Sequence, residues 1–177
     1  RGLGDVYKRQ FFGFTVMKKL TNKSKVINLG CRLNFFESEI IENILKKEKD
    51  VSKVVINTCA VTNNAVQKSI YAVKKALKDF PNSEVIVTGC ASQVEKNRFE
   101  NLGHISKIVD NKLKTNPNSY VSEDWVHEQT FNFPSIDYLS TQRTRAMLQI
   151  QQGCNHRCTF CIIPYGRGDA VSLTFTE

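Results

Sequence analysis

The chain has 177 residues, 41% of them hydrophobic, so it is long enough for one packed domain, or for one domain and part of another. No apolar run approaches the ~20 residues that cross a bilayer, which excludes the membrane-spanning class. No secretory signal precedes the six cysteines, which excludes the disulfide-rich secreted class and favours a cytoplasmic protein with reduced or metal-bound thiols. The formal net charge of +8 suits a polyanionic partner but does not by itself identify one.

Residues 1–16 are expected to be a non-native leader. The first ten residues read as translated adapter sequence, and Met17 reads as the natural start. Such a segment is left out of fold reasoning. It holds +2 of the net charge, so the rest of the chain keeps +6 and still leans basic.

Strands and helices alternate along the first two thirds of the chain. Three apolar runs are typical of buried parallel strands, and a shorter run predicts a fourth. These runs lie at 25–31, 53–59, 84–90 and 107–110. The alternation predicts an α/β domain over residues 17–115 with a parallel, flavodoxin- or Rossmann-like sheet and right-handed crossovers. The order of its strands is taken by analogy with flavodoxin-like folds.

Capping residues indicate where the helices begin and end. Asn34 is expected to cap the first helix, because Glu37 follows it at the spacing of a capping box. Thr62 or Asn63 is expected to begin the second helix, and Pro81 ends it. A single third helix is expected before the fourth strand.

A change of composition marks the end of this domain. Residues 116–140 are polar with scattered aromatics and predict an irregular linker, and residues 141–177 are expected to begin a second domain. Within it, residues 147–152 read as a strand that runs into Gly153. The sixteen residues after Cys161 are expected to hold no further complete element, so we expect the chain to be part of a longer protein.

Three cysteines, here called the strand-end cysteines, follow the ends of successive predicted strands: Cys31, Cys59 and Cys90. Parallel strands collect ligands at their carboxyl edge, and neighbouring strands lie only ~4.8 Å apart. Small residues beside each cysteine let the backbone approach a bulky ligand. We interpret these thiols as ligands of one iron–sulfur cluster. The alternative is three cysteines packed in the core as small hydrophobes.

A second set, the loop cysteines, has the spacing Cys154-x3-Cys158-x2-Cys161. Three such thiolates can hold three irons of a cubane cluster and leave the fourth iron open for chemistry. A structural zinc site normally has C-x2-C pairs and four ligands, and ferredoxin loops use C-x2-C-x2-C with a distant fourth cysteine. His156 is interpreted as a loop residue rather than a ligand. Zinc binding and simple electron transfer are therefore the weaker alternatives.

This motif resembles the signature of radical S-adenosylmethionine (SAM) enzymes. Four segments in order then resemble the methylthiotransferase family, and they lie at 29–34, 57–62, 88–93 and 152–168. Within that family the segments are most similar to the branch acting on threonylcarbamoyladenosine in tRNA. The sequence departs from the family after Gly168, where Asp169 stands in place of a usual basic residue.

The resemblance implies that residues 141–177 are the first strand and cluster loop of a partial β/α barrel, the radical SAM core. It also implies two [4Fe-4S] clusters and SAM as cofactors. The loop cysteines would hold the cluster that cleaves SAM to a 5′-deoxyadenosyl radical, and the strand-end cysteines would hold an auxiliary cluster whose open iron carries the sulfur. A second SAM would methylate that sulfur, and the methylthio group would replace a hydrogen on C2 of the modified adenosine beside the anticodon. Phe160 would contact the SAM adenine through its backbone, with packing under the cluster loop as the alternative role.

The implied partners are a tRNA substrate and an external electron donor, with no membrane. The chain alone is expected to be inactive. The alternatives are a related enzyme acting on isopentenyladenosine in tRNA or on a ribosomal protein, a radical SAM enzyme with an unrelated α/β domain, and a non-catalytic iron–sulfur module. The lysines of the second helix are interpreted as a solvated face rather than an RNA contact. No catalytic residue beyond the cluster ligands, and no oligomeric state, is indicated.

Overall fold

The computed structural model describes residues 24–47, 51–121, 133–134 and 147–174. The expected leader, and most of the expected linker with Trp125, Phe131 and Tyr138, lie outside these ranges. No helix within them is long and apolar enough to cross a membrane.

Four parallel strands form the central sheet, in the order β1-β2-β3-β4. The strands are β1 (Lys25–Asn28), β2 (Lys53–Thr58), β3 (Glu84–Gly89) and β4 (Lys107–Ile108). All six residues of β2 are buried, as expected for a strand that is covered on both faces. The predicted α/β class with a parallel sheet is therefore confirmed.

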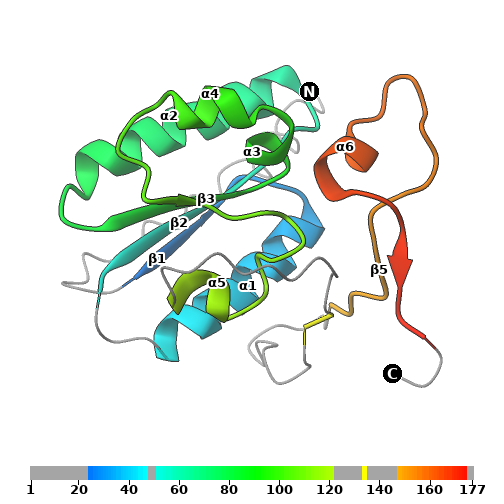
Figure 1. Cartoon of the computed structure of the whole chain (residues 1–177), viewed down its shortest axis with the longest axis horizontal. Coiled ribbons are helices and arrows are strands. Elements are labelled where there is room, and N and C mark those ends of the chain that lie inside the picture. Colours follow the sequence, from blue (N-terminus) through cyan, green and yellow to red (C-terminus); the bar gives the residue numbers. More distant parts are fainter. Residues whose placement is uncertain (1–23, 48–50, 122–132, 135–146, 175–177) are drawn as a thin grey trace, which may run out of the picture.

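Helices cover both faces of this sheet (Figure 1). They are α1 (Arg32–Lys47), α2 (Asn63–Asp79), α3 (Cys90–Val94), α4 (Lys96–Glu100) and α5 (Asn118–Val121). Side chains of β2 alternate between the two layers: Val55 joins the core beside α1, whereas Val54 and Ile56 join the core beside α2. Phe99 of α4 completes the second core, and Tyr120 of α5 completes the first.

The strand order differs from the flavodoxin-like order. There the first strand lies between the second and the third, whereas here β2 lies between β1 and β3. The chain thus advances in one direction across the sheet while α1 and α2 lie on opposite faces. The β1–α1–β2 and β2–α2–β3 crossovers consequently have opposite hands, so the expectation of uniformly right-handed crossovers is wrong for one of them. The apolar runs are too similar to encode their order.

The capping predictions have opposite outcomes. Thr62 caps α2, because its hydroxyl accepts a hydrogen bond from the Ala65 amide at 3.1 Å. Helix α1 begins at Arg32, so Asn34 lies inside the helix, and its prediction as a cap is wrong. Asn34 is instead buried, and its side-chain amide donates to the Thr58 carbonyl at 2.8 Å. This bond ties α1 to the end of β2.

Two further boundaries differ from those expected. Helix α3 begins at Cys90 itself, directly after β3, and Glu95 separates it from α4 where one helix was expected. Part of the expected linker forms α5, which buries Tyr120. The Tyr120 hydroxyl donates to the Lys114 carbonyl at 2.6 Å, and the Tyr120 carbonyl accepts from the Lys53 ammonium at 2.5 Å. These bonds fasten the segment to the sheet.

The segment after residue 146 forms a small second unit. Strand β5 (Gln151–Gln152) pairs antiparallel with β6 (Val171–Ser172), and α6 (Ile163–Arg167) lies between them in the chain. The strand predicted at 147–152 is therefore shorter than expected. The expectation of no complete element after Cys161 is wrong, since a helix with proline in its first turn follows there.

Candidate functional site: two sets of cysteines

The strand-end cysteines lie at the carboxyl edge of the central sheet. The register of β2 and β3 pairs Thr58 with Gly89, so Cys59 and Cys90 leave the sheet on neighbouring strands. Both of these cysteines are buried, whereas Cys31, at the start of α1, is exposed. The edge expected from the sequence is therefore where the structure places all three.

The thiols at this edge interact electrostatically. Burial raises the pKa of the Cys59 thiol, although a hydrogen bond with the Val61 backbone opposes the shift. Charge on Cys90 and Cys31 raises this pKa further, whereas the Arg167 guanidinium lowers it. The three cysteines thus share one electrostatic environment, and metal binding there would have to displace the Cys59 proton.

Buried polar side chains hold the strand ends in place. The Thr58 hydroxyl donates to the Thr88 carbonyl at 2.7 Å and accepts from the Ser92 amide at 3.1 Å. The Asn57 amide donates to the Asn34 carbonyl at 2.9 Å. Each bond joins a different pair of elements, and satisfied buried hydrogen bonds rigidify the groups they connect. The edge that carries the cysteines is therefore a fixed frame.

Glycine is required at the end of β3. Gly89 has φ +101°, a conformation that other residues rarely adopt. A Cβ built there would lie 2.4 Å from the backbone nitrogen and oxygen of Thr58. The close approach of two strands immediately before Cys59 and Cys90 thus depends on the absence of a side chain.

The loop cysteines lie in the turn between β5 and α6. The Cys154 amide donates to the Gly168 carbonyl at 3.1 Å, and the Cys161 amide donates to the Cys158 carbonyl at 3.0 Å. Cys158 is exposed, and Phe160 is 92% exposed. The backbone bonds shape the loop, and the exposed Phe160 side chain does not pack under it.

A buried ion network joins α1 to the end of α6. The Glu37 carboxylate accepts two hydrogen bonds from Arg167, at 2.8 and 3.1 Å, and pairs with the Lys114 ammonium at 2.5 Å. Arg167 also donates to the side-chain oxygens of Asn34 and Gln152. The Glu37 and Lys114 side chains are 0% exposed, and that of Arg167 is 5% exposed. Two buried cations therefore share one carboxylate.

Burial and Glu37 act in opposite directions on the two cations. For Arg167, burial opposes the charge, but the ion pair with Glu37 outweighs it and raises the pKa. For Lys114, burial outweighs the attraction of Glu37 and lowers the pKa. A charge on Cys90 would raise the pKa of both cations, so the ion network and this cysteine interact electrostatically.

Helix α6, which follows the loop cysteines in the chain, packs against one of the strand-end cysteines. A Cβ built on Gly166 would lie 3.0 Å from the Cβ of Cys90, so α6 sits directly against the start of α3. The Asn111 side chain donates to the Gly166 carbonyl and to the Cys90 sulfur, the latter at 3.7 Å. Figure 1 shows α6 beside α3, at the same end of the sheet as the strand-end cysteines.

The donor set fits an iron–sulfur cluster better than a single metal ion. Within the described ranges, no three His, Cys, Asp or Glu side chains lie close enough to share one ion. A cubane cluster makes a different demand, because each thiolate binds a separate iron. Each set offers three thiols, the ligand type that such clusters use. The ligand type of each set is therefore compatible with an iron–sulfur cluster.

Sequence reasoning does not find the ion network. Glu37 and Arg167 are 130 residues apart, and no local pattern connects them. The spacing from Asn34 to Glu37 is a local signal, but it indicated a capping box rather than two partners of Arg167. Lys114 follows the last strand of the sheet and carries no motif. Only the fold shows that these side chains meet.

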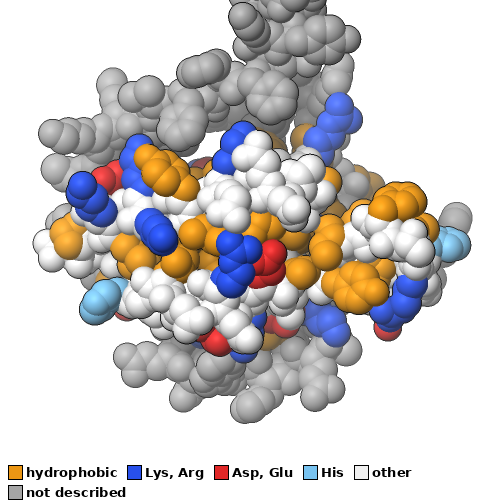
Figure 2. All heavy atoms as spheres, turned by 90° about the horizontal axis from the view of Figure 1, so that it is seen from above, with side chains coloured by type: hydrophobic (Ala, Val, Ile, Leu, Met, Phe, Trp, Pro, Cys, Tyr) orange, Lys and Arg blue, Asp and Glu red, His pale blue; other side chains and the backbone are white. Residues whose placement is uncertain are grey.

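The surface over α2 and α4 carries separate basic side chains rather than one basic patch (Figure 2). The lysines of α2 that the sequence assigned to a solvated face are exposed; they are Lys68, Lys74, Lys75 and Lys78. Hydrophobic side chains gather at the right of the view, on the side where α6 lies in Figure 1. Exposed apolar residues of the segment 147–174, which contains α6, include Leu148, Ile150 and Tyr165.

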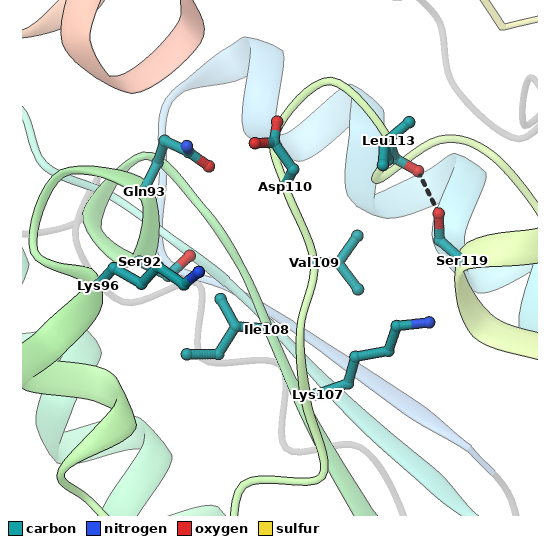
Figure 3. Close-up of a pocket in the computed structure, with 9 residues that line it drawn as sticks. All are labelled: Ser92, Gln93, Lys96, Lys107, Ile108, Val109, Asp110, Leu113 and Ser119. Atoms are coloured by element: carbon teal, nitrogen blue, oxygen red, sulfur yellow. Dashed lines mark hydrogen bonds between the residues drawn. The ribbon is translucent and has the colours of Figure 1, made fainter. Parts of the chain in front are cut away.

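A pocket of about 100 Å³ opens beside β4 (Figure 3). Ser92 and Gln93 of α3 line one side, and Val109, Asp110 and Leu113 line the other. No cysteine is among its lining residues. The pocket therefore adjoins the strand-end cysteines through α3 but does not contain them.

Comparisons with known proteins give the chain a context. A family model described as uncharacterized protein family UPF0004 matches residues 23–110. The threonylcarbamoyladenosine tRNA methylthiotransferase MtaB of Rickettsia prowazekii is 35% identical over 163 residues, which is 85% of this chain and 37% of the relative. The protein of the same name from Bacillus subtilis is 34% identical over 164 residues, 79% of this chain and 35% of the relative.

A relative whose name gives another substrate has a similar sequence identity to the chain. The ribosomal protein uS12 methylthiotransferase RimO of Klebsiella pneumoniae is 37% identical over 181 residues, 91% of this chain and 39% of the relative. The chain thus spans between 35% and 39% of the length of these three relatives. The matches extend past the family model into the segment that holds the loop cysteines.

Proposed function

Because the chain belongs to the methylthiotransferase family, we propose that it takes part in transferring a methylthio group to C2 of N6-threonylcarbamoyladenosine beside the anticodon of tRNA. One observation supports this most strongly: α6, the helix that directly follows the loop cysteines, packs against Cys90 at the start of α3. A methylthio transfer needs a radical source and a sulfur source close together, and two adjacent thiol sets suit that requirement.

The six cysteines have separate roles in this proposal. The strand-end cysteines would hold an auxiliary [4Fe-4S] cluster, and the loop cysteines would hold the [4Fe-4S] cluster that binds SAM. When bound, these groups supply the sulfur and the radical chemistry, which belongs to the cofactors. The chain's own residues hold the thiols apart in two groups, each short of a fourth cysteine ligand.

Residues around the thiols control their surroundings. The buried frame at the sheet edge excludes water from Cys59 and Cys90. Cys158 is exposed, which suits binding of SAM beside it. Phe160 is exposed at this loop, which suits a backbone contact with the SAM adenine. No other side chain of the described segments is assigned to catalysis.

The partners follow from the same chemistry. A modified adenosine must leave the base stack to reach such a site, as for other enzymes that modify bases. A basic protein, with a net charge of +8, suits a polyanionic tRNA. The clusters would need an external electron donor, and reduced thiols suit the cytoplasm.

Ribosomal protein uS12 is the second candidate substrate. The RimO relative is 37% identical over 91% of the chain, which is as close as the tRNA enzymes. The fold and the cysteine sets suit either substrate. The two candidates differ in the macromolecule that carries the methyl label.

The test uses a protein that contains this chain and extends to the length of its relatives, supplied with methyl-labelled SAM, reductant, tRNA and ribosomal protein. Label in tRNA nucleosides is expected. Label in the ribosomal protein alone would show that this protein, and not tRNA, is the substrate. In Cys158→Ala, cleavage of SAM to 5′-deoxyadenosine should stop. In Cys59→Ala, that cleavage should persist while no methylthio group is transferred. Transfer by Cys59→Ala would contradict the role of the strand-end cysteines.

A further inference from the structure

The ion network of Glu37, Lys114 and Arg167 lies between the two cysteine sets. Glu37 is in the second turn of α1, which begins directly after Cys31, and Arg167 ends the helix that follows Cys161. Their side chains are buried, although ionic groups are seldom buried unless they are paired. A buried ion pair contributes little net stability compared with apolar packing, and fixing one arrangement is its better supported role.

The hydrogen bonds of Arg167 go to two separate segments, and Glu37 joins it to a third. Its guanidinium donates to Glu37 and Asn34 of α1 and to Gln152 of β5. Lys114, from the loop after β4, pairs with Oε2 of the same carboxylate, the oxygen that also accepts from Nη2 of Arg167. A planar guanidinium with several directed donors fixes orientation as well as distance. Moving α6 would break these bonds together.

The loop cysteines have no comparable connection of their own. The other ion pair of that loop joins Arg157 to Asp169 at 3.1 Å, and their side chains are 60% and 74% exposed. Exposed pairs are weak and do not fix geometry. Among the described residues, the polar contacts that tie this loop to the sheet domain are those of Arg167 and the bond from Asn111 to the Gly166 carbonyl.

We propose that Arg167, held by Glu37 and Lys114, is a positioning residue that fixes the loop cysteines relative to the strand-end cysteines before any cofactor binds. This role rests on the proposed function, in which the two sets act on one substrate. Glu37 is the anchor, and Lys114 holds the second carboxylate oxygen so that Glu37 cannot turn away. The alternative is that the network only stabilises the fold.

The first test measures amide hydrogen exchange in the chain without iron. Arg167→Gln should speed exchange of residues 162–170 by about tenfold or more, with β2 unchanged, because a local opening is made easier. Arg167→Lys keeps the charge but loses the forked set of donors, so its exchange rate should lie between those of the parent chain and Arg167→Gln. Arg157→Gln, the matched control in the same loop, should change nothing. Equal loosening by both glutamine variants, or none by Arg167→Gln, would overturn the proposal.

The second test measures geometry rather than stability. In the chain reconstituted with iron and sulfide, the two reduced clusters should broaden each other's electron paramagnetic resonance signal. Arg167→Gln should lose this interaction while keeping its iron, and Arg167→Lys should recover part of it. An interaction that is absent from the parent chain, or unchanged in Arg167→Gln, would overturn the proposal. A chain that binds no iron would instead contradict the proposed function. The hydrogen-exchange measurement would then still test whether Arg167 holds the loop in place.

If Arg167→Gln also speeds hydrogen exchange in β2, the exchange pattern of Arg167→Lys decides between a positioning role and a role in stability alone. Faster exchange confined to residues 162–170 would support a positioning role. Loss of protection throughout the sheet in the lysine variant would show that the network serves stability alone, and would overturn the proposal.

Discussion

The strand-end cysteines and the loop cysteines are held in different ways. Cys59 and Cys90 leave a parallel sheet whose last residues are joined by buried hydrogen bonds. Cys158 is exposed, and among the described residues the polar contacts that join its loop and α6 to the sheet domain are those of Arg167 and the bond from Asn111 to the Gly166 carbonyl. One set is therefore built into the fold, and the other is attached to it.

This difference predicts which substitutions disturb both cysteine sets and which disturb only one. A change at the sheet edge should disturb both cysteine sets, because the loop is attached to that edge through α1 and α3. A change within the loop should leave the sheet intact, because the core of the domain contains few of its side chains. Four substitutions test this comparison, from the largest effect to the smallest.

Glu37→Gln should have the largest effect. It leaves Lys114 and Arg167 as two buried cations without a carboxylate, and breaking a buried ion pair costs about 3–5 kcal/mol. The free energy of unfolding, measured with urea, should fall by that amount. Glu100→Gln removes an exposed carboxylate paired with Lys96 and should cost under about 1 kcal/mol. Similar losses in both variants would mean that the network is not buried.

Gly89→Ala should be nearly as damaging. A Cβ at Gly89 meets the Thr58 backbone at 2.4 Å, and the residue also has a positive φ, so about 2–5 kcal/mol should be lost from strain and overpacking together. Gly103→Ala is the matched control, because Gly103 has φ +68° but no atom near its Cβ position. It should cost only the backbone part, about 1–2 kcal/mol. Equal melting curves for both variants would rule out the close approach of β2 and β3.

Tyr120→Phe should change the response of the sheet domain to alkaline pH. Burial holds the pKa of the Tyr120 hydroxyl well above its ordinary 10.0, so the folded protein keeps a proton that the unfolded chain loses. Stability should therefore fall above pH 10 by about 1.4 kcal/mol per pH unit, and the phenylalanine variant should lack this component. Urea unfolding at pH 8 and pH 11 tests it. Parallel changes in parent and variant would show that Tyr120 titrates normally.

Thr62→Ala should have the smallest effect. It removes the side-chain bond to the Ala65 amide at the start of α2, which costs about 1 kcal/mol at a helix cap. Thr62→Ser keeps the hydroxyl and should retain most of the stability. Thermal unfolding of both variants checks this, and equal losses would mean that the hydroxyl does not cap the helix. The loop cysteines should react with a thiol reagent at the same rate in both.

The sheet and its cysteines were predictable because local patterns encode them. Apolar runs mark β2 and β3, and Cys59 and Cys90 directly follow them. The cap at Thr62 was predictable for the same reason, since a cap depends on the three residues after it. The order of the strands was not predictable, because pairing depends on contacts between distant segments.

The connection between the two cysteine sets was not predictable from the sequence. Asn34 and Glu37 have the spacing of a capping box, but Asn34 bonds to Thr58 and both bond to Arg167. A charged side chain in a helix is normally interpreted as exposed. Only tertiary contact between α1 and α6 makes burial of Glu37 favourable. The sequence therefore identified the ligand candidates but not what aligns them.

Counting iron and sulfide tests the central claim most directly, namely that two separate three-cysteine sites are present in this chain. After anaerobic reconstitution, the 177-residue chain should hold about eight irons and eight sulfides. Cys59→Ala and Cys158→Ala should each hold about four, because each loses one cluster and keeps the other. About four irons in the parent chain, with no further loss in Cys59→Ala, would contradict the claim and leave the strand-end cysteines as core residues.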